Sequence, residues 1–182
     1  MNTKKMKRIY LVLIIGFGAS FCFAQEKVTK VFYYDSDWNR TSTNNNALYL
    51  RIITFYENDL NHPIGLVKDY YAESGKLQWE GEFPYYDIEN EDNNREEGMS
   101  IWYYENGKKM NQCKYDAKGE KYGLVKYWYE NGQLEVTYNY HNGKLNGDMS
   151  LYNIKGVLQE IVSYKDDVKG LTQKFNENGE IQ

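Results

Sequence analysis

The feature that most constrains this chain is a repeat of about 24 residues that runs from Gly65 to Gln182. In the clearest copies an opening glycine is followed nine residues later by a second glycine. These pairs are Gly98 and Gly107, Gly123 and Gly132, Gly147 and Gly156, and Gly170 and Gly179. Such self-similarity indicates a stacked repeat array, because a unit this short cannot bury a core by itself.

Each copy has the pattern of a β-hairpin. In the copy that begins at Gly123, residues 124–129 are dense in strand-forming side chains, and Glu130-Asn131-Gly132-Gln133 follows. Asn-Gly is a strong hairpin signal, and we predict a type I′ turn here. The return strand alternates apolar and polar side chains from Leu134 to His141, which is typical of a sheet with one buried face. The sequence therefore predicts an all-β fold.

The other copies differ in detail. The copy from Gly65 has one more residue before its turn at Ser74-Gly75. Eight residues after each turn glycine stands an aromatic residue, and we expect these rings to pack as a ladder from one hairpin to the next. The four rings are Phe83, Tyr115, Tyr140 and Tyr164.

An acidic segment at residues 85–97 interrupts the repeat. We expect a lengthened loop between two hairpins, since insertions in repeat arrays map to loops. A calcium site is the alternative, because carboxylates and amides are ligands for hard cations. The segment, however, lacks the spacing and the central glycine of the twelve-residue EF-hand loop.

Residues 1–24 have the pattern of an export signal. Lys4, Lys5, Lys7 and Arg8 precede an apolar run at residues 9–23, and small residues favour cleavage before Gln25. An uncleaved anchor and a lipoprotein modified at Cys22 are the alternatives, and Phe21 argues against the second. We therefore expect an exported protein, periplasmic or secreted, with no transmembrane segment in its mature form.

Charge and cysteine content limit the function further. Removal of residues 1–24 leaves 18 Lys and Arg against 26 Asp and Glu, a formal charge of −8, which disfavours nucleic-acid binding. Cys113 would be the one remaining cysteine, so no intrachain disulfide is expected, and we predict that it is a buried apolar residue on the face of Tyr115. His62 and His141 fit no metal-ligand spacing. We predict no cofactor and no metal.

Residues 25–64, before the repeats, are predicted to form a β cap. Residues 27–34 and 48–56 have strand patterns. In the second strand Tyr49, Arg51, Ile53 and Phe55 share one face, and apolar residues occur on both faces. We expect this strand to be covered on both sides and to seal the N-terminal edge of the array.

The unit G-x-x-x-x-[YW]-Y-E-N-G-x-L, with N-G-K-x-x-G after it, resembles the MORN-repeat variant family, bacterial proteins often labelled YwqK-type antitoxins. The matching residues are Gly98 with 103–107, Gly123 with 128–134, and 142–147. The resemblance covers residues 65–182 and extends to 33–38 and 48–56. It implies an elongated single-layer antiparallel sheet that binds or scaffolds rather than catalyses. An antitoxin against a cytoplasmic toxin would not need an export signal.

The sequence favours a non-enzymatic scaffold at the cell envelope that binds a protein, peptide or glycan. Its candidate binding surface is aromatic and consists of Trp79, Trp102, Tyr127 and Trp128. Mutual packing of these rings along the array is the alternative explanation. A second hypothesis is an enzyme acting on envelope polymer through paired carboxylates, for which Glu80 and Glu82 are the candidates. A third is self-association through the open edge at residues 170–182, and the oligomeric state is not predicted.

Overall fold

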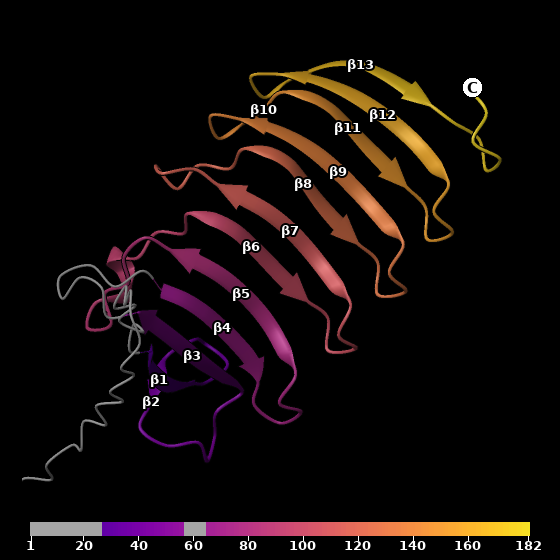
Figure 1. Ribbon diagram of the computed structural model, residues 1–182. Helices are drawn as coiled ribbons and strands as arrows, with labels where there is room; N and C mark the ends of the chain where they lie inside the picture. The colour runs from indigo at the N-terminus through magenta and orange to yellow at the C-terminus, as the bar shows by residue number, and fades with distance from the viewer. Residues whose placement is uncertain (1–26, 57–64) are drawn as a thin grey trace, which may run out of the picture.

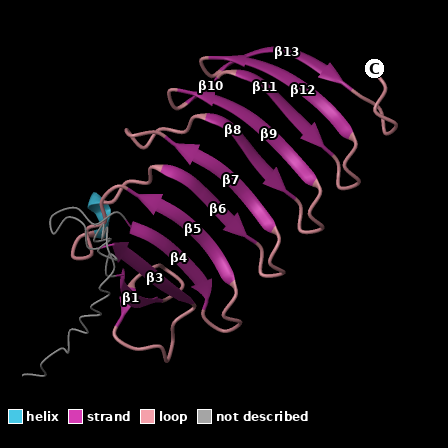
Figure 2. Cartoon of the chain, in the orientation of Figure 1, coloured by secondary structure: helices cyan, strands magenta, loops and turns pink. Residues whose placement is uncertain are grey.

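The computed structural model describes residues 27–56 and 65–182, and in these residues the chain forms one open antiparallel sheet of 13 strands (Figure 1). The strands follow one another across the sheet, except that β1 lies outside β3, β2 lies outside β1, and the short β10 pairs with β9 off the main path, so that β9 and β11 are neighbours. Within the described part the only helical element is a short 3₁₀ turn, η1 (Glu91–Asn93) (Figure 2). The prediction of an all-β sheet of tandem hairpins is confirmed.

The strands have the following bounds: β1 Lys27–Tyr34, β2 Arg40–Thr41, β3 Tyr49–Tyr56, β4 Gly65–Tyr71, β5 Leu77–Phe83, β6 Gly98–Tyr103, β7 Lys109–Tyr115, β8 Gly123–Trp128, β9 Leu134–His141, β10 Lys144–Leu145, β11 Gly147–Tyr152, β12 Leu158–Lys165 and β13 Val168–Lys174.

The repeats are hairpins, and each is paired more extensively within itself than with its neighbour. The β8–β9 ladder runs from Gly123↔Tyr140 to Trp128↔Leu134, whereas β7 and β8 are in register only at Asn111↔Tyr127 and Gln112↔Lys126. The hairpin turns line one side of the sheet and the connections between hairpins line the other (Figure 1). This is the expected geometry of an array whose units contact only their neighbours.

The predicted type I′ turn at Asn131-Gly132 is wrong. Gly132 N–H donates to Tyr129 O at 2.8 Å, and Tyr129 N–H donates to Gln133 O at 2.9 Å. Gly132 has φ +90°, but Asn131 is not in the positive-φ region that a type I′ turn requires of both central residues. The loop therefore has three residues, of the kind in which a type I turn is followed by a left-handed glycine.

The type I′ turn occurs instead at the connection between β9 and β10. Asn142 has φ +49° and Gly143 has φ +74°, and the flanking residues His141 and Lys144 are paired. A two-residue connection needs both central residues in the left-handed region, and Asn-Gly satisfies this at low cost. The same dipeptide thus forms two different turns, because the flanking strands differ in register.

Side chains supplement the short backbone pairing between hairpins. Three tyrosine hydroxyls, each from the end of the first strand of a hairpin, donate to a carbonyl of the next hairpin. The bonds are Tyr71 to Tyr103 O at 3.1 Å, Tyr104 to Trp128 O at 2.6 Å and Tyr129 to Tyr152 O at 2.8 Å. The turn asparagines repeat the pattern, Asn106 to Glu130 O at 2.9 Å and Asn131 to Ile154 O at 2.8 Å. These bonds explain why tyrosine and asparagine recur in the repeat.

The predicted aromatic ladder differs from what the structure contains. Each of the four rings stands opposite the opening glycine of its own hairpin, as in Gly98↔Tyr115 and Gly123↔Tyr140. Among the described residues, ring contacts join Phe83 to Trp79 and Tyr140 to Tyr138 on the same strand, and none joins successive members of the predicted ladder. A ring opposite a glycine covers backbone that has no side chain of its own.

One face of the sheet, which we call the inner face, holds the buried side chains. In β3, β4 and β5 it carries the main apolar cluster, formed by Ile53, Val67, Trp79 and Phe83 with Tyr86 from the following loop. Further along the array Val125, Val136 and Val162 are buried on the same face. Cys113 is buried too, as predicted, and burial raises the pKa of its thiol.

The N-terminal strands continue the same sheet. β3 pairs with β4, the first strand of the repeat array, and so covers the N-terminal edge of the array as expected; on its other side β3 pairs with β1, and β1 with β2 forms the edge of the whole sheet. The predicted signal segment, Cys22 and His62 lie outside the described residues. In the described residues no helix is long and apolar enough to cross a membrane.

Candidate functional site

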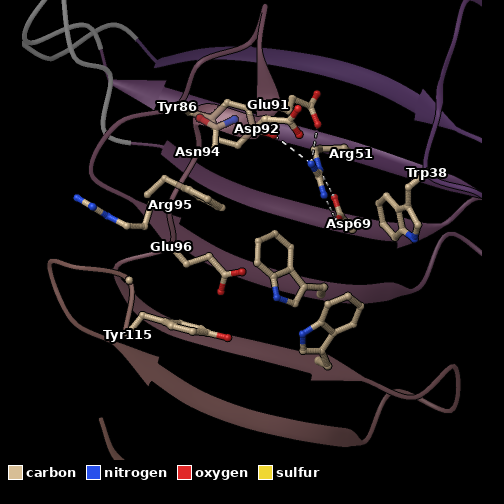
Figure 3. Close-up of a pocket in the computed structure, with 14 residues that line it drawn as sticks. Trp38, Arg51, Asp69, Tyr86, Glu91, Asp92, Asn94, Arg95, Glu96 and Tyr115 are labelled. Carbon is tan, nitrogen blue, oxygen red and sulfur yellow. Dashed lines mark hydrogen bonds and ion pairs between the residues drawn. The ribbon is translucent and has the colours of Figure 1, made fainter. Parts of the chain in front are cut away.

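A cavity of about 520 Å³ opens on the inner face over β3 to β7, where the loop at residues 84–97 folds back across the sheet (Figure 3). This volume suits a small ligand or one side chain of a partner. The lining combines aromatic and charged side chains: Trp38, Arg51, Asp69, Trp79, Phe83, Tyr86, Glu91, Asp92, Asn94, Arg95, Glu96, Trp102 and Tyr115, with the backbone of Gly119.

A buried ion pair forms one end of the cavity. Arg51 on β3 and Asp69 on β4 face each other across the strands, and the guanidinium binds the carboxylate through two bonds, Nε to Oδ1 and Nη2 to Oδ2, both 2.8 Å. Burial acts to lower the pKa of Arg51, but the hydrogen-bonded Asp69 carboxylate overrides it and keeps the guanidinium charged. This fork geometry is strong and fixes both side chains.

The same arginine holds the overlying loop. Arg51 Nη1 donates to Tyr86 Oη at 3.0 Å and to Glu91 Oε2 at 3.1 Å. Glu91 also pairs with Arg40, and Tyr86 packs edge-on against Phe83 with ring centroids 5.1 Å apart. The acidic segment is therefore a loop between hairpins, as predicted, and its charge and its tyrosine dock it on the inner face.

Three indole rings line the cavity. Trp79 and Trp102 stand opposite each other on β5 and β6 with centroids 5.9 Å apart, and Trp79 Nε1 donates to Ser100 Oγ at 2.9 Å. Gly81 leaves room for the Trp79 ring, because a Cβ atom there would lie 2.3 Å from Trp79 Cζ2.

Trp38, the third indole, comes from the loop between β1 and β2 and has φ +62°, an unusual conformation for a bulky residue. Its ring stacks on Tyr49 with centroids 4.5 Å apart and planes 6° from parallel. Asp35 Oδ1 accepts backbone bonds from Asp37 and Asn39, both 2.9 Å, and so stabilises the loop on both sides of Trp38. Strained conformations of this kind cluster at ligand sites.

Glu96 contributes a carboxylate that nothing in the described chain neutralises at close range. Its Oε2 atom is buried and has no hydrogen-bond partner. Burial raises the pKa of this carboxyl, while a hydrogen bond with Ser100 and the charges of Lys121 and Arg51 act in the opposite direction. Figure 3 shows Glu96 beside Tyr115, away from the Arg51 end.

The cavity is built where the repeats depart from their own pattern. Four residues after the opening glycine, on the inner face, Asp69 occupies the position that is Trp102, Tyr127 and Leu151 in the next three copies. Two residues after the opening glycine, Ser100 occupies the position of the buried Val67 and Val125 in neighbouring copies. Its hydroxyl accepts the hydrogen bond from the Trp79 indole. The repeat supplies the backbone, and these substitutions supply polar chemistry.

The structure separates the four predicted binding residues into two pairs. Trp79 and Trp102 line the cavity together, and Trp79 is only 4% exposed. Tyr127 and Trp128 lie on β8 outside the lining, where Tyr127 packs edge-on against Tyr138 at 6.1 Å and Trp128 lies 5.9 Å from the Lys109 ammonium. The four rings therefore do not form one continuous surface.

Sequence reasoning missed Trp38, Arg51, Asp69 and Glu96 as site residues. For two of them, Arg51 and Asp69, the sequence contains a feature that could have indicated a site. Arg51 interrupts an otherwise apolar strand face, and a buried charge needs a partner. Asp69 is the one carboxylate at its repeat position. Trp38 and Glu96 lie in irregular loops and carried none.

The remaining predicted carboxylates lie elsewhere. Glu80 and Glu82 share the outer face of β5, as expected from their spacing, and do not line the cavity. Glu80 pairs with Lys68 at 2.9 Å and accepts the Tyr103 hydroxyl at 2.7 Å. In residues 27–56 and 65–182 no group of three or more His, Cys, Asp or Glu side chains is arranged to hold a metal ion, so the calcium alternative for residues 85–97 gains no support.

Comparison with known families agrees with the repeat geometry. Residues 96–117 and 121–142 each match the MORN repeat variant. The chain carries MORN variant repeats. No curated protein matches it. The two matched MORN repeats contain the hairpins β6–β7 and β8–β9, and the first contributes Glu96, Trp102 and Tyr115 to the cavity. Strands and loops before the matched repeats, with Gly119 between the two repeats, supply the rest of the lining.

Proposed function

We propose that this MORN-repeat protein is a non-enzymatic, exported binding scaffold at the cell envelope, and that the cavity over β3 to β7 is its ligand-binding site. The observation that carries this proposal is the cavity itself. It combines three indoles with a charged network on a rigid sheet, and it is closed on one side by a docked loop. Concave, largely pre-formed sites with convergent polar groups are the usual places where ligands bind.

The chemistry of the site supports binding over catalysis. Asp69 is held by two bonds from Arg51, and Glu91 is shared between Arg51 and Arg40. A carboxylate so neutralised is a poor base or nucleophile, so neither Asp69 nor Glu91 is suited to a paired-carboxylate hydrolysis of a glycosidic bond. Export is inferred from residues 1–24, and it is the reason for which an antitoxin role against a cytoplasmic toxin is not adopted.

The experiment is an affinity capture from envelope extract with the purified protein as bait, compared with Trp102→Leu and with Trp128→Leu as a matched control. Trp102 lines the cavity and Trp128 does not. We expect Trp102→Leu to abolish capture and Trp128→Leu to leave it unchanged, with both variants giving the wild-type circular dichroism spectrum. Equal capture by the wild type and a folded Trp102→Leu protein would overturn the proposal. Fractionation of cells checks export separately.

A further inference from the structure

The charge of the cavity selects for one class of ligand. Four carboxylates line it, Asp69, Glu91, Asp92 and Glu96, against two guanidinium groups, Arg51 and Arg95. Arg51 is already bound to Asp69 and Glu91, and Figure 3 shows Arg95 extending away from it. The negative charge that remains disfavours an anionic ligand such as a phosphate or a uronate.

Glu96 marks the position that a counter-charge would occupy. Its Oε2 atom is buried and unpartnered beside aromatic side chains, and such a carboxylate is costly unless it is protonated or paired with a cation. Tyr115 and Trp102 line the same cavity, and Figure 3 shows Tyr115 beside Glu96. A positively charged group placed there would pair with the carboxylate and lie against the π-faces of the rings.

The protein already uses this arrangement internally. The Arg51 guanidinium carbon lies 5.1 Å from the Tyr34 ring centroid, 5.4 Å from Trp38 and 5.9 Å from Trp79, and its charge is met by Asp69. The rings and the carboxylate thus form an aromatic cage occupied by an arginine of the same chain. Glu96 lines the same cavity as Trp102 and Tyr115, and no cation of the described chain lies within hydrogen-bond distance of its Oε2 atom.

We propose that the cavity binds an alkylammonium or guanidinium group on an apolar stem, the chemistry of a lysine or arginine side chain, with Glu96 as its counter-charge and Trp102 and Tyr115 as its aromatic contacts. This inference rests on the proposed function, since it names the ligand class of the same site. The apolar stem would pack along the indoles, as long cationic side chains do on aromatic surfaces.

The test is a titration of the purified protein, followed by tryptophan fluorescence and calorimetry, with two matched probes. Nα-acetyl-lysine methylamide carries the cation, and its Nε-acetylated form has nearly the same shape without the charge. A short lysine-containing peptide and n-butylammonium form two further arms, which distinguish a peptide source from a free amine. The protein variants are Glu96→Gln and, as control, Glu89→Gln, an exposed carboxylate of the same loop.

We expect the cationic probes to bind and the Nε-acetylated probe to bind at least about tenfold more weakly. Glu96→Gln should reduce binding of the cationic probes by at least about tenfold, and Glu89→Gln should leave it within about twofold. Equal affinity for charged and neutral probes, no change in Glu96→Gln, or no binding of any cationic probe would each overturn the cation inference. The proposed function is tested separately, because envelope capture that depends on Trp102 would survive those results.

Discussion

The two halves of this sheet use the same hairpin in different ways. From β1 to β7 the inner face is overlaid by the loop at 84–97, and Ile53 and Val67 are fully buried beneath side chains of that part. From β8 to β13 the hairpins repeat regularly, tyrosines flank single buried valines, and β13 is exposed along its whole length. The regular half shows what the repeat encodes, and the overlaid half shows what departures from it add.

This comparison shows that the residues that join the hairpins differ from the residues that give the cavity its charge. From the β6–β7 hairpin onward, successive hairpins are joined by uniform bonds from tyrosine hydroxyls and turn asparagines. In the overlaid half a buried ion pair lies under the docked loop, and the loop itself carries Glu96, whose buried Oε2 atom has no hydrogen-bond partner. A buried charge is costly without its partner, so substitutions in the overlaid half should have the larger effects.

The largest loss of stability is expected for Arg51→Met. It leaves the Asp69 carboxylate, only 1% exposed, without its counter-charge and releases Glu91, and we expect the free energy of unfolding to fall by about 3–5 kcal/mol. Urea denaturation followed by tryptophan fluorescence measures it. Lys68→Met, which breaks the half-exposed pair with Glu80 on the opposite face of the same strands, should cost less than about 1 kcal/mol. Equal losses would remove the distinction between the two faces.

Gly81→Ala should have the next largest effect. The new methyl group would lie 2.3 Å from Trp79 Cζ2, so the indole must shift within the apolar cluster, at a cost of about 2 kcal/mol. The expected signs are a lower urea midpoint and a changed tryptophan emission spectrum. Leu171→Ala on the exposed strand β13 is the control from the regular half and should change stability by less than about 0.5 kcal/mol. An unchanged spectrum in Gly81→Ala would show that Trp79 is not confined as described.

Removal of one hydroxyl that joins successive hairpins should cost less stability. Tyr104→Phe and Tyr129→Phe each delete a bond to the next hairpin, and we expect losses of about 1 kcal/mol each. Because units of a repeat array are coupled mainly to their neighbours, faster amide exchange should appear in the two adjoining hairpins and not throughout the sheet. Tyr122→Phe, whose ring is 40% exposed, is the control. A uniform increase in exchange would contradict local coupling.

The smallest expected effect has the opposite sign. Glu96→Gln should stabilise the protein at neutral pH by about 0.5–1 kcal/mol, since it removes a buried charge that serves a ligand rather than the fold.

The effect should depend on pH. Burial raises the pKa of Glu96 above its ordinary value of 4.5, so the folded protein takes up a proton here before the unfolded chain does. The wild type therefore gains stability relative to Glu96→Gln as the pH falls through the raised pKa, and the difference between them should shrink on acidification. Both proteins share the titratable and charged groups around Glu96. These are Arg51, Asp69, Glu91, Asp92, Arg95, Cys113, Tyr115 and Lys121. A pH-independent difference would contradict the assignment.

The sequence predicts the regular half well because its signals are local. Glycine spacing, Asn-Gly pairs and alternation place the hairpins. The same alternation in β7, at the border of the two halves, predicts the burial of Cys113 on the face of Tyr115. The turn type at Asn131-Gly132 was mispredicted because it depends on the register of the flanking strands, which the dipeptide does not set.

The overlaid half was less predictable because its contacts are long-range. Arg51 and Glu91 are 40 residues apart in the sequence, and no local sequence pattern around either residue indicates that they pair. The position of Asp69 within the repeat and the charge of Arg51 in an apolar strand were visible signals, and only the structure joins them. Trp38 reaches the cavity from a loop whose conformation no local pattern indicates.

The indole N–H resonances of the four tryptophans offer the most direct test, because Trp38, Trp79 and Trp102 line the cavity and Trp128 lies in the regular half. We predict that Nα-acetyl-lysine methylamide, added to the ¹⁵N-labelled protein, shifts the three cavity resonances and leaves that of Trp128 in place. An equal shift of Trp128, or no shift of the other three, would contradict the account that the departures from the repeat form the binding site.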